Sequence, residues 1–198
     1  MKKVLIAIIL LAALGYGGYY FFGKKETKNS EPEPRPLSIN KNSGAFNQSY
    51  QQLLAAYYNL KDALVASDSV KANDASKALV IHADSLRINE IMGDSTGMIK
   101  ETAKTFTATI SGSAQALIKE KTLEAKRKEF EMLSDAMWSL TRTVKYDGEK
   151  VYYQYCPMAF DNKGAYWLSN QAVIRNPYFG DEMLECGKVE DSLDYSKN

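Results

Sequence analysis

The sequence predicts a mainly α-helical protein: a four-helix antiparallel bundle with a small, loop-rich C-terminal cap that contains short strands. Apolar residues recur every three or four positions in four successive stretches between residues 44 and 144, as in helices that bury one face. After residue 146 the pattern changes to aromatic, β-favouring runs separated by turn residues. Because the connections between the four stretches are short, neighbouring helices should run antiparallel.

The first helix is predicted over residues 44–66, and the second follows at once. The first has an apolar stripe at helical spacing, formed by Phe46, Tyr50, Leu53, Leu54, Tyr57, Leu60 and Leu64. Residues 67–69 can end this helix and cap the next one. The stripe of the second helix includes Ala75, Leu79, His82 and Leu86.

A clear break at residues 92–97 separates these helices from two more. The third is predicted over Met98–Lys119, and the fourth begins after a Thr122 cap and continues to about Val144. The methionines of this region form no sulfur cluster and are expected in the core: Met92, Met98, Met132 and Met137.

The cap is predicted over residues 146–190. Val151–Cys156 is an extended, aromatic run that Pro157 ends. A turn at residues 162–164 leads into Ala165–Ser169, and residues 176–180 form a second turn region. We expect the cap to cover one end of the bundle with its aromatic residues, Trp167, Tyr178 and Phe179.

The N-terminus resembles an export signal. Two lysines precede an apolar run that begins at residue 4 and continues to Phe22, about the length of a membrane-spanning helix. We therefore predict a signal or transmembrane anchor over residues 1–23, a Pro/Glu/Lys-rich tether over 24–42 and the helical domain over 43–198. The domain is expected in the periplasm, anchored to the inner membrane. The alternative is cleavage near residues 13–15 and secretion into the periplasm.

Composition argues against several classes of function. The net charge is +1 and no basic stripe is present, so nucleic acid is not an expected partner. Paired catalytic carboxylates, a glycine-rich phosphate loop and close pairs of zinc-binding cysteines are all missing from the sequence. We therefore expect that the protein is not an enzyme.

Both cysteines lie in the cap, and each has a methionine nearby. Met158 follows Cys156 by two positions, and Met183 precedes Cys186 by three. Thiolate and thioether donors select soft ions such as Cu(I) or Ag(I). The four residues are therefore candidate metal ligands. His82, the only histidine, could complete the site.

Two other interpretations of the cysteines stay open. A disulfide between Cys156 and Cys186 would close a loop of about 30 residues and stabilise the fold by roughly 3–4 kcal/mol. The protein would then be a metal-free interaction module whose aromatic cap docks an envelope protein. Alternatively, one cysteine is a nucleophile with His82 as its base, but the sequence indicates no third group to orient that base.

The C-terminal runs CPMAF, KGAYWLS, IRNPYFG and MLECG, together with residues 57–65, also carry a family resemblance. They resemble a family of uncharacterised exported bacterial domains, found alone or appended to periplasmic adaptor subunits of copper/silver-type heavy-metal efflux systems. The resemblance implies an all-helical periplasmic domain associated with metal resistance. The expected function is thus that of a membrane-anchored, soft-metal-binding accessory protein, with a heavy-metal efflux complex as a candidate partner.

Overall fold

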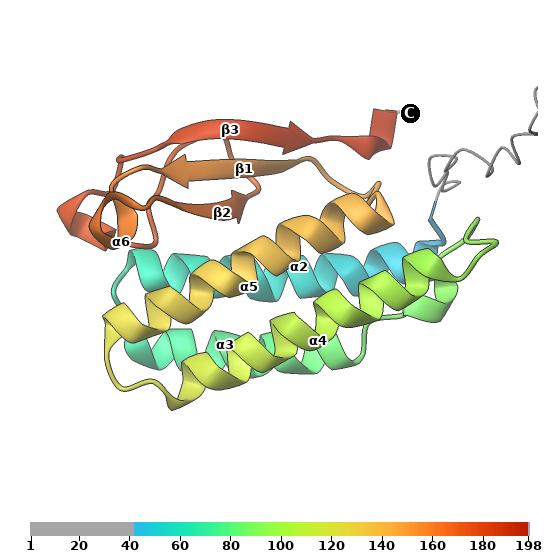
Figure 1. Cartoon of the computed structure of the whole chain (residues 1–198), viewed down its shortest axis with the longest axis horizontal. Coiled ribbons are helices and arrows are strands. Elements are labelled where there is room, and N and C mark those ends of the chain that lie inside the picture. Colours follow the sequence, from blue (N-terminus) through green and yellow to red (C-terminus); the bar gives the residue numbers. More distant parts are fainter. Residues whose placement is uncertain (1–41, 198) are drawn as a thin grey trace, which may run out of the picture. The chain divides into compact units, whose positions relative to one another are not determined.

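A computed structural model describes residues 42–197. Four long helices form a bundle, as predicted: α2 Gly44–Val65, α3 Ser69–Asp84, α4 Met98–Lys119 and α5 Leu123–Val144 (Figure 1). The boundaries of α2, α4 and α5 lie within a residue of their predictions, whereas α3 ends at Asp84, before the last residue of its predicted stripe, Leu86. The predicted anchor, and the tether up to residue 41, lie outside the described residues. Between residues 42 and 197, no helix is long and apolar enough to cross a membrane.

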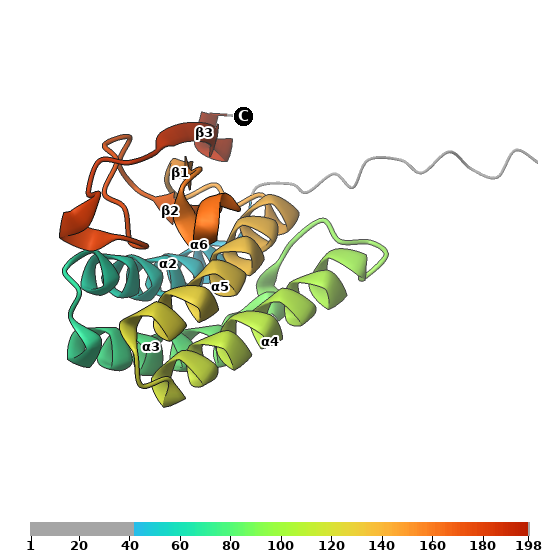
Figure 2. The same cartoon turned by 60° about the vertical axis from the view of Figure 1, so that its left-hand side comes forward.

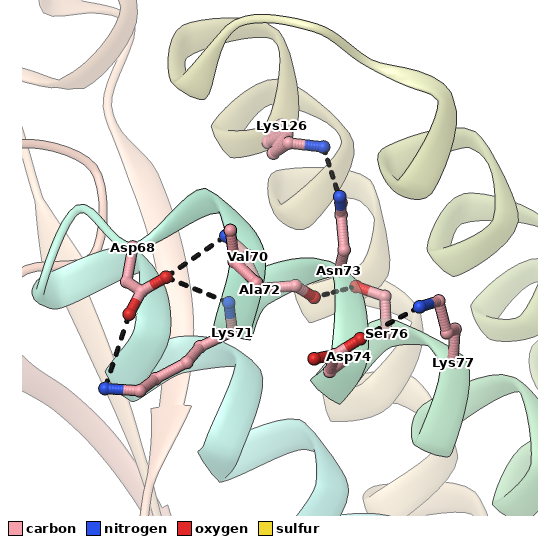
Figure 3. Close-up of polar contacts among 9 residues, drawn as sticks. All are labelled: Asp68, Val70, Lys71, Ala72, Asn73, Asp74, Ser76, Lys77 and Lys126. Atoms are coloured by element: carbon pink, nitrogen blue, oxygen red, sulfur yellow. Dashed lines mark hydrogen bonds and ion pairs between the residues drawn. The ribbon is translucent and has the colours of Figure 1, made fainter.

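Three of the helices begin at side-chain caps. Ser43 Oγ accepts a hydrogen bond from Phe46 N at 3.1 Å, and Thr122 Oγ1 accepts one from Ala125 N at 3.2 Å. Asp68 Oδ1 accepts from two backbone N–H groups at the start of α3, as Figure 3 shows. These caps satisfy N–H groups that have no partner inside the helix, and they explain why the helices start where they do.

A buried lysine ties three helices together. Lys126, on α5, is only 2% exposed. Its ammonium donates to Asn73 Oδ1 on α3 at 2.7 Å, drawn in Figure 3, and to the Leu117 carbonyl in the last turn of α4 at 2.8 Å. Burial lowers the pKa of this ammonium because it disfavours the charged form. The lysine thus adds a second donor to the Leu117 carbonyl, which also accepts from Glu120 N at 3.2 Å, and joins the end of α4 to α3 and α5.

The cap contains a three-stranded antiparallel sheet in the order β2-β1-β3. Strands β1 Val151–Cys156 and β2 Ala165–Ser169 confirm the extended segments that the sequence predicts. The third strand, β3 Lys188–Leu193, was not expected, because its residues are mostly exposed and lack an apolar alternation. The short helices are α6 Ala159–Asn162 and the 3₁₀ turns η1 Ile88–Glu90, η2 Gly180–Glu182 and η3 Tyr195–Lys197.

The sheet lies along the side of α5 and α2, away from α3 and α4 (Figures 1 and 2). The expectation that the cap covers one end of the bundle is therefore wrong. One polar contact and one ring contact show why. Leu168 N on β2 donates to the hydroxyl of Tyr57 on α2 at 3.0 Å. The ring of Trp138 on α5 stacks on Tyr153 of β1, with centroids 4.2 Å apart. These contacts hold the sheet flat against both helices.

The two faces of the sheet have different neighbours. Tyr153, Tyr155 and Tyr166 stack in a row on the face that meets α5. The register places Gln154 opposite Trp167 on the other face, which Cys156 shares because side chains alternate along a strand. Gln154 Nε2 donates to the Gln171 carbonyl at 2.8 Å, so the chain after β2 covers this face. The first cysteine is therefore buried in the part of the core that the cap adds to the bundle.

The methionines of the bundle do not all lie in the core. Met137 is fully buried on α5, as predicted. The other three are more than half exposed, which contradicts the expectation: Met92, Met98 and Met132. Met98 and Met132 lie on solvent-facing sides of amphipathic helices, and Met92 lies in the loop before α4. Apolar character alone could not place them, because a folded surface always retains many apolar atoms.

Candidate functional site

The two cysteines meet in the cap. Cys156 is the last residue of β1 and is fully buried, whereas Cys186 precedes β3 and is partly exposed. Their Sγ atoms lie 3.1 Å apart. A disulfide bond is about 2.05 Å long, so the structure holds two thiols in direct contact. The fold therefore brings together the sulfur pair that both the metal and the disulfide interpretations need.

Asn176 holds the segment that carries Cys186. Its side chain is fully buried and makes two hydrogen bonds. Nδ2 donates to the Cys186 carbonyl at 2.9 Å, and Oδ1 accepts from Tyr178 N at 2.8 Å. The backbone N–H of Asn176 also donates to the Leu184 carbonyl at 2.8 Å. One side chain thus fixes both ends of the loop that returns the chain to Cys156.

Gly187 allows the close approach of this segment to β1. Its φ is +145°, and a Cβ there would lie 2.8 Å from the Tyr155 carbonyl oxygen and 3.0 Å from Trp167 Cη2. Any side chain would push residue 187, and Cys186 with it, away from the strand that carries Cys156.

A group of aromatic residues connects the cap to the bundle. The ring of Tyr178 packs edge-on against Trp167, with centroids 6.0 Å apart, and against Phe160 at 5.3 Å. Phe130 of α5 lies 5.9 Å from the same ring. The Tyr178 hydroxyl donates to the Tyr166 carbonyl. Tyr178 is therefore the residue that joins Trp167 of the cap to α5.

Both candidate thioether ligands line one groove of the cap, and neither cysteine is among its lining residues. The groove has a volume of about 880 Å³ and lies between the first turns of α5 and the α6 and η2 segments. Met158 is 44% exposed and Met183 is 36% exposed. The Met183 carbonyl accepts a hydrogen bond from Cys186 N at 3.1 Å, which keeps this methionine next to its cysteine. The structure thus groups all four predicted sulfur ligands in the cap.

His82 does not join them. Arg87, five residues after His82, donates its N–H to Ser49 near the start of α2 at 3.3 Å. The loop that carries Cys186 contacts the opposite end of α2, where a Cβ at Gly180 would lie 2.8 Å from the Val65 carbonyl oxygen. His82 is also 13 residues into α3, about 20 Å from its first residue. The expectation that His82 is a metal ligand or a general base at the thiols is therefore wrong. The helix α3 places this residue at the other end of the bundle.

The electrostatics of the pair favour the protonated thiol. The hydrogen bond to Cys156 and partial burial both raise the pKa of the Cys186 thiol. A metal ion would have to displace this proton, so its binding should strengthen as pH rises. Between residues 42 and 197, no three His, Cys, Asp or Glu side chains form a group suited to a metal ion. A metal at this site would depend on the two thiols and the thioethers.

The distance between the two sulfur atoms lies between the length of a disulfide bond and the separation of two thiolates that bind one metal ion. Two thiolates that share a tetrahedral ion with bonds of 2.3 Å lie about 3.8 Å apart. The observed pair would have to open by about 0.7 Å to hold such an ion and close by about 1 Å to form a disulfide. Both changes are within the reach of side-chain rotation. One wall of the groove that holds the methionines includes a left-handed turn, with positive φ at Phe160, Asp161 and Asn162.

Comparison with known proteins gives a family match for part of the chain. Residues 53–148 match the family model described as "Protein of unknown function (DUF3347)". A DUF3347 domain therefore covers most of the bundle. No curated protein and no solved structure matches the chain. The match supports the uncharacterised-domain part of the resemblance. The DUF3347 match ends before β1, so Cys156, Cys186 and both candidate thioethers lie outside it.

Proposed function

We propose that this protein is a membrane-anchored, periplasmic soft-metal-binding protein that takes up Cu(I), or Ag(I), at its C-terminal cap. Cys156 and Cys186 supply the thiolates, and Met158 and Met183 supply thioethers from the adjoining groove. The observation that carries the proposal is the contact of the two sulfur atoms, 3.1 Å apart. Both methionines line a groove and lie within three residues of their cysteines in the chain. Such donors select soft monovalent ions.

The ion binds without catalysis in this proposal. The protein stores Cu(I) or passes it to a heavy-metal efflux complex of the cell envelope. Two features support a transfer role. Cys186 is partly exposed, and the groove opens both thioethers to solvent, so a partner can approach the ion from that side. The apolar N-terminal run supports the anchored, exported location.

A second candidate function rests on the burial of Cys156. A fully buried sulfur whose partner has to come only about 1 Å nearer is also compatible with a structural disulfide in an oxidising compartment. In that case the cap is a metal-free module that docks another envelope protein, and the disulfide fastens residue 186 to β1.

A competition titration with a Cu(I) chelator distinguishes the two. We would compare the reduced full-length protein with Cys186→Ser, Met158→Leu and Met183→Leu. For metal binding we expect one Cu(I) per chain, a loss of affinity of at least 100-fold in Cys186→Ser and about tenfold losses in the methionine variants.

Met92→Leu is the matched control, because Met92 is similarly exposed and lies in the loop before α4. Its affinity should equal that of the unaltered protein. Two results would contradict the metal site: the reduced protein does not bind Cu(I), and the disulfide resists reduction under native conditions. The metal-free interaction module with a structural disulfide would then be the better interpretation.

A further inference from the structure

A second polar site lies away from the cap core, where the end of α5 meets the start of α2. It is formed by the side chains of Asn42, Asn47 and Asp147 and by the carbonyl oxygens of Val144 and Lys145. The chain enters the described domain here, and the loop from α5 to β1 leaves here. The proposed soft-metal function uses none of these groups, which are all oxygen donors or amides.

The Asn42 amide faces more acceptors than it can satisfy. Its Nδ2 lies 3.0 Å from the Val144 carbonyl oxygen, 3.3 Å from that of Lys145 and 3.3 Å from Asp147 Oδ1. An amide nitrogen has only two hydrogens for these three oxygens. Asn47 Nδ2 donates to the same carboxylate oxygen at 2.8 Å. The cluster is therefore rich in acceptors around a single point.

Three further oxygens of the cluster are buried without a hydrogen-bond partner: Asn42 Oδ1, Asn47 Oδ1 and Asp147 Oδ2. Asn42 as a whole is only 8% exposed. Each unsatisfied buried acceptor costs about 1–3 kcal/mol. The described part of the chain has six such side-chain atoms, and half of them belong to these three adjacent residues. Because all three are acceptors, a group that carries positive charge would satisfy them together.

We propose that this cluster binds a hard cation, with Ca²⁺ the best fit. Asp and Asn side-chain oxygens and backbone carbonyls are the ligands that Ca²⁺ takes, in flexible geometry with bonds of 2.3–2.6 Å. Rotation of either amide about its last bond exchanges nitrogen for oxygen and turns a donor into a ligand. The Val144 and Lys145 carbonyls end α5, and the C-terminus of a helix favours a cation. The bound ion would join the loop at Asp147 to the start of α2.

Two variants test the site in opposite directions. Asp147→Asn removes the only carboxylate and should weaken Ca²⁺ binding by at least tenfold. Asn47→Asp adds a carboxylate beside it and should strengthen binding by about tenfold, since affinity follows the charge of the ligands. Thermal unfolding of the full-length protein is measured over a Ca²⁺ titration. Tb³⁺ luminescence sensitised by Tyr146, which precedes Asp147 in the chain, reports occupancy.

The exposed Asp181, on η2, provides the control: Asp181→Asn should bind as the unaltered protein does. The Asn47→Asp variant keeps the test valid if Asp147→Asn does not fold. Without Ca²⁺ it should unfold at a lower temperature, because two carboxylates repel, and Ca²⁺ should reverse this loss. If Ca²⁺ neither raises the unfolding temperature of the unaltered protein nor rescues Asn47→Asp, the proposed site does not exist.

Discussion

Cys156 Sγ and Cys186 Sγ are 3.1 Å apart, although 30 positions separate them in the sequence. One is fully buried and the other partly exposed, so a reagent or a partner protein reaches the pair through Cys186. The contact also raises the pKa of the Cys186 thiol. The chemistry of the cap therefore depends on proton loss from one accessible sulfur.

The alkylation rate of Cys186 should show this dependence. Because the thiolate is the reactive form, iodoacetamide should modify Cys186 slowly below the usual pKa of a thiol, and the rate should keep rising with pH above it. Cys156→Ala removes the hydrogen bond that is the main cause of the shift. Its Cys186 should react faster at pH 8, by about tenfold for each pKa unit recovered. Mass spectrometry of the modified peptide over a pH series gives both rates. Equal rates in the two proteins would mean that the sulfur contact is not formed in solution.

Removal of the Asn176 side chain should destabilise the cap. Asn176→Ala leaves the Cys186 carbonyl and the Tyr178 N–H without partners, which we expect to cost about 2–4 kcal/mol in the free energy of unfolding. Urea denaturation of the reduced protein measures the change. Asn170→Ala, at an exposed position in the same segment, should change stability by less than about 0.5 kcal/mol. Similar losses in both variants would contradict the proposed role of Asn176.

Two glycine substitutions should have different effects: one should disturb the cysteine pair, and the other should stabilise a helix. In Gly187→Ala the new methyl group meets the Tyr155 carbonyl and the Trp167 ring, so the Cys186 segment must move away from β1. A disulfide formed by oxidation of Cys156 and Cys186 should then be easier to reduce, as titration in a glutathione redox buffer would measure. In Gly112→Ala no atom lies within 4 Å of the new methyl group, and the helix α4 should gain about 0.5–1 kcal/mol. An unchanged reduction potential in Gly187→Ala would show that the close approach is unimportant.

The Tyr57 hydroxyl should matter more than the Tyr50 hydroxyl. Tyr57→Phe leaves the buried Leu168 N–H of β2 without an acceptor, and we expect a loss of about 1–3 kcal/mol. Tyr50→Phe removes only a bond to Thr141, whose hydroxyl still donates to the Met137 carbonyl. That variant should lose no more than about 1 kcal/mol. Chemical denaturation of both proteins tests the order, and a larger loss in Tyr50→Phe would show that the sheet is not held through Tyr57.

The helical part of the fold could be predicted because it depends on local patterns. Apolar spacing located all four long helices, and Thr122 was recognised as the cap of α5. The strand β3 could not be predicted, since its residues are stabilised by pairing with β1 and not by an apolar face of their own. The same limit applies to the exposed Met98 and Met132, whose faces of their helices are decided by the neighbouring helices.

The candidate site divides in the same way. The sequence by itself determined the chemical identity of the donors, because Cys156 with Met158 and Cys186 with Met183 are soft ligands wherever the chain carries them. Only the tertiary structure decided that the two thiols touch, that the thioethers share a groove and that His82 lies at the other end of the bundle. The physical reason is that contacts between distant segments depend on strand register and on buried groups such as Asn176 and Gly187, which no local pattern encodes.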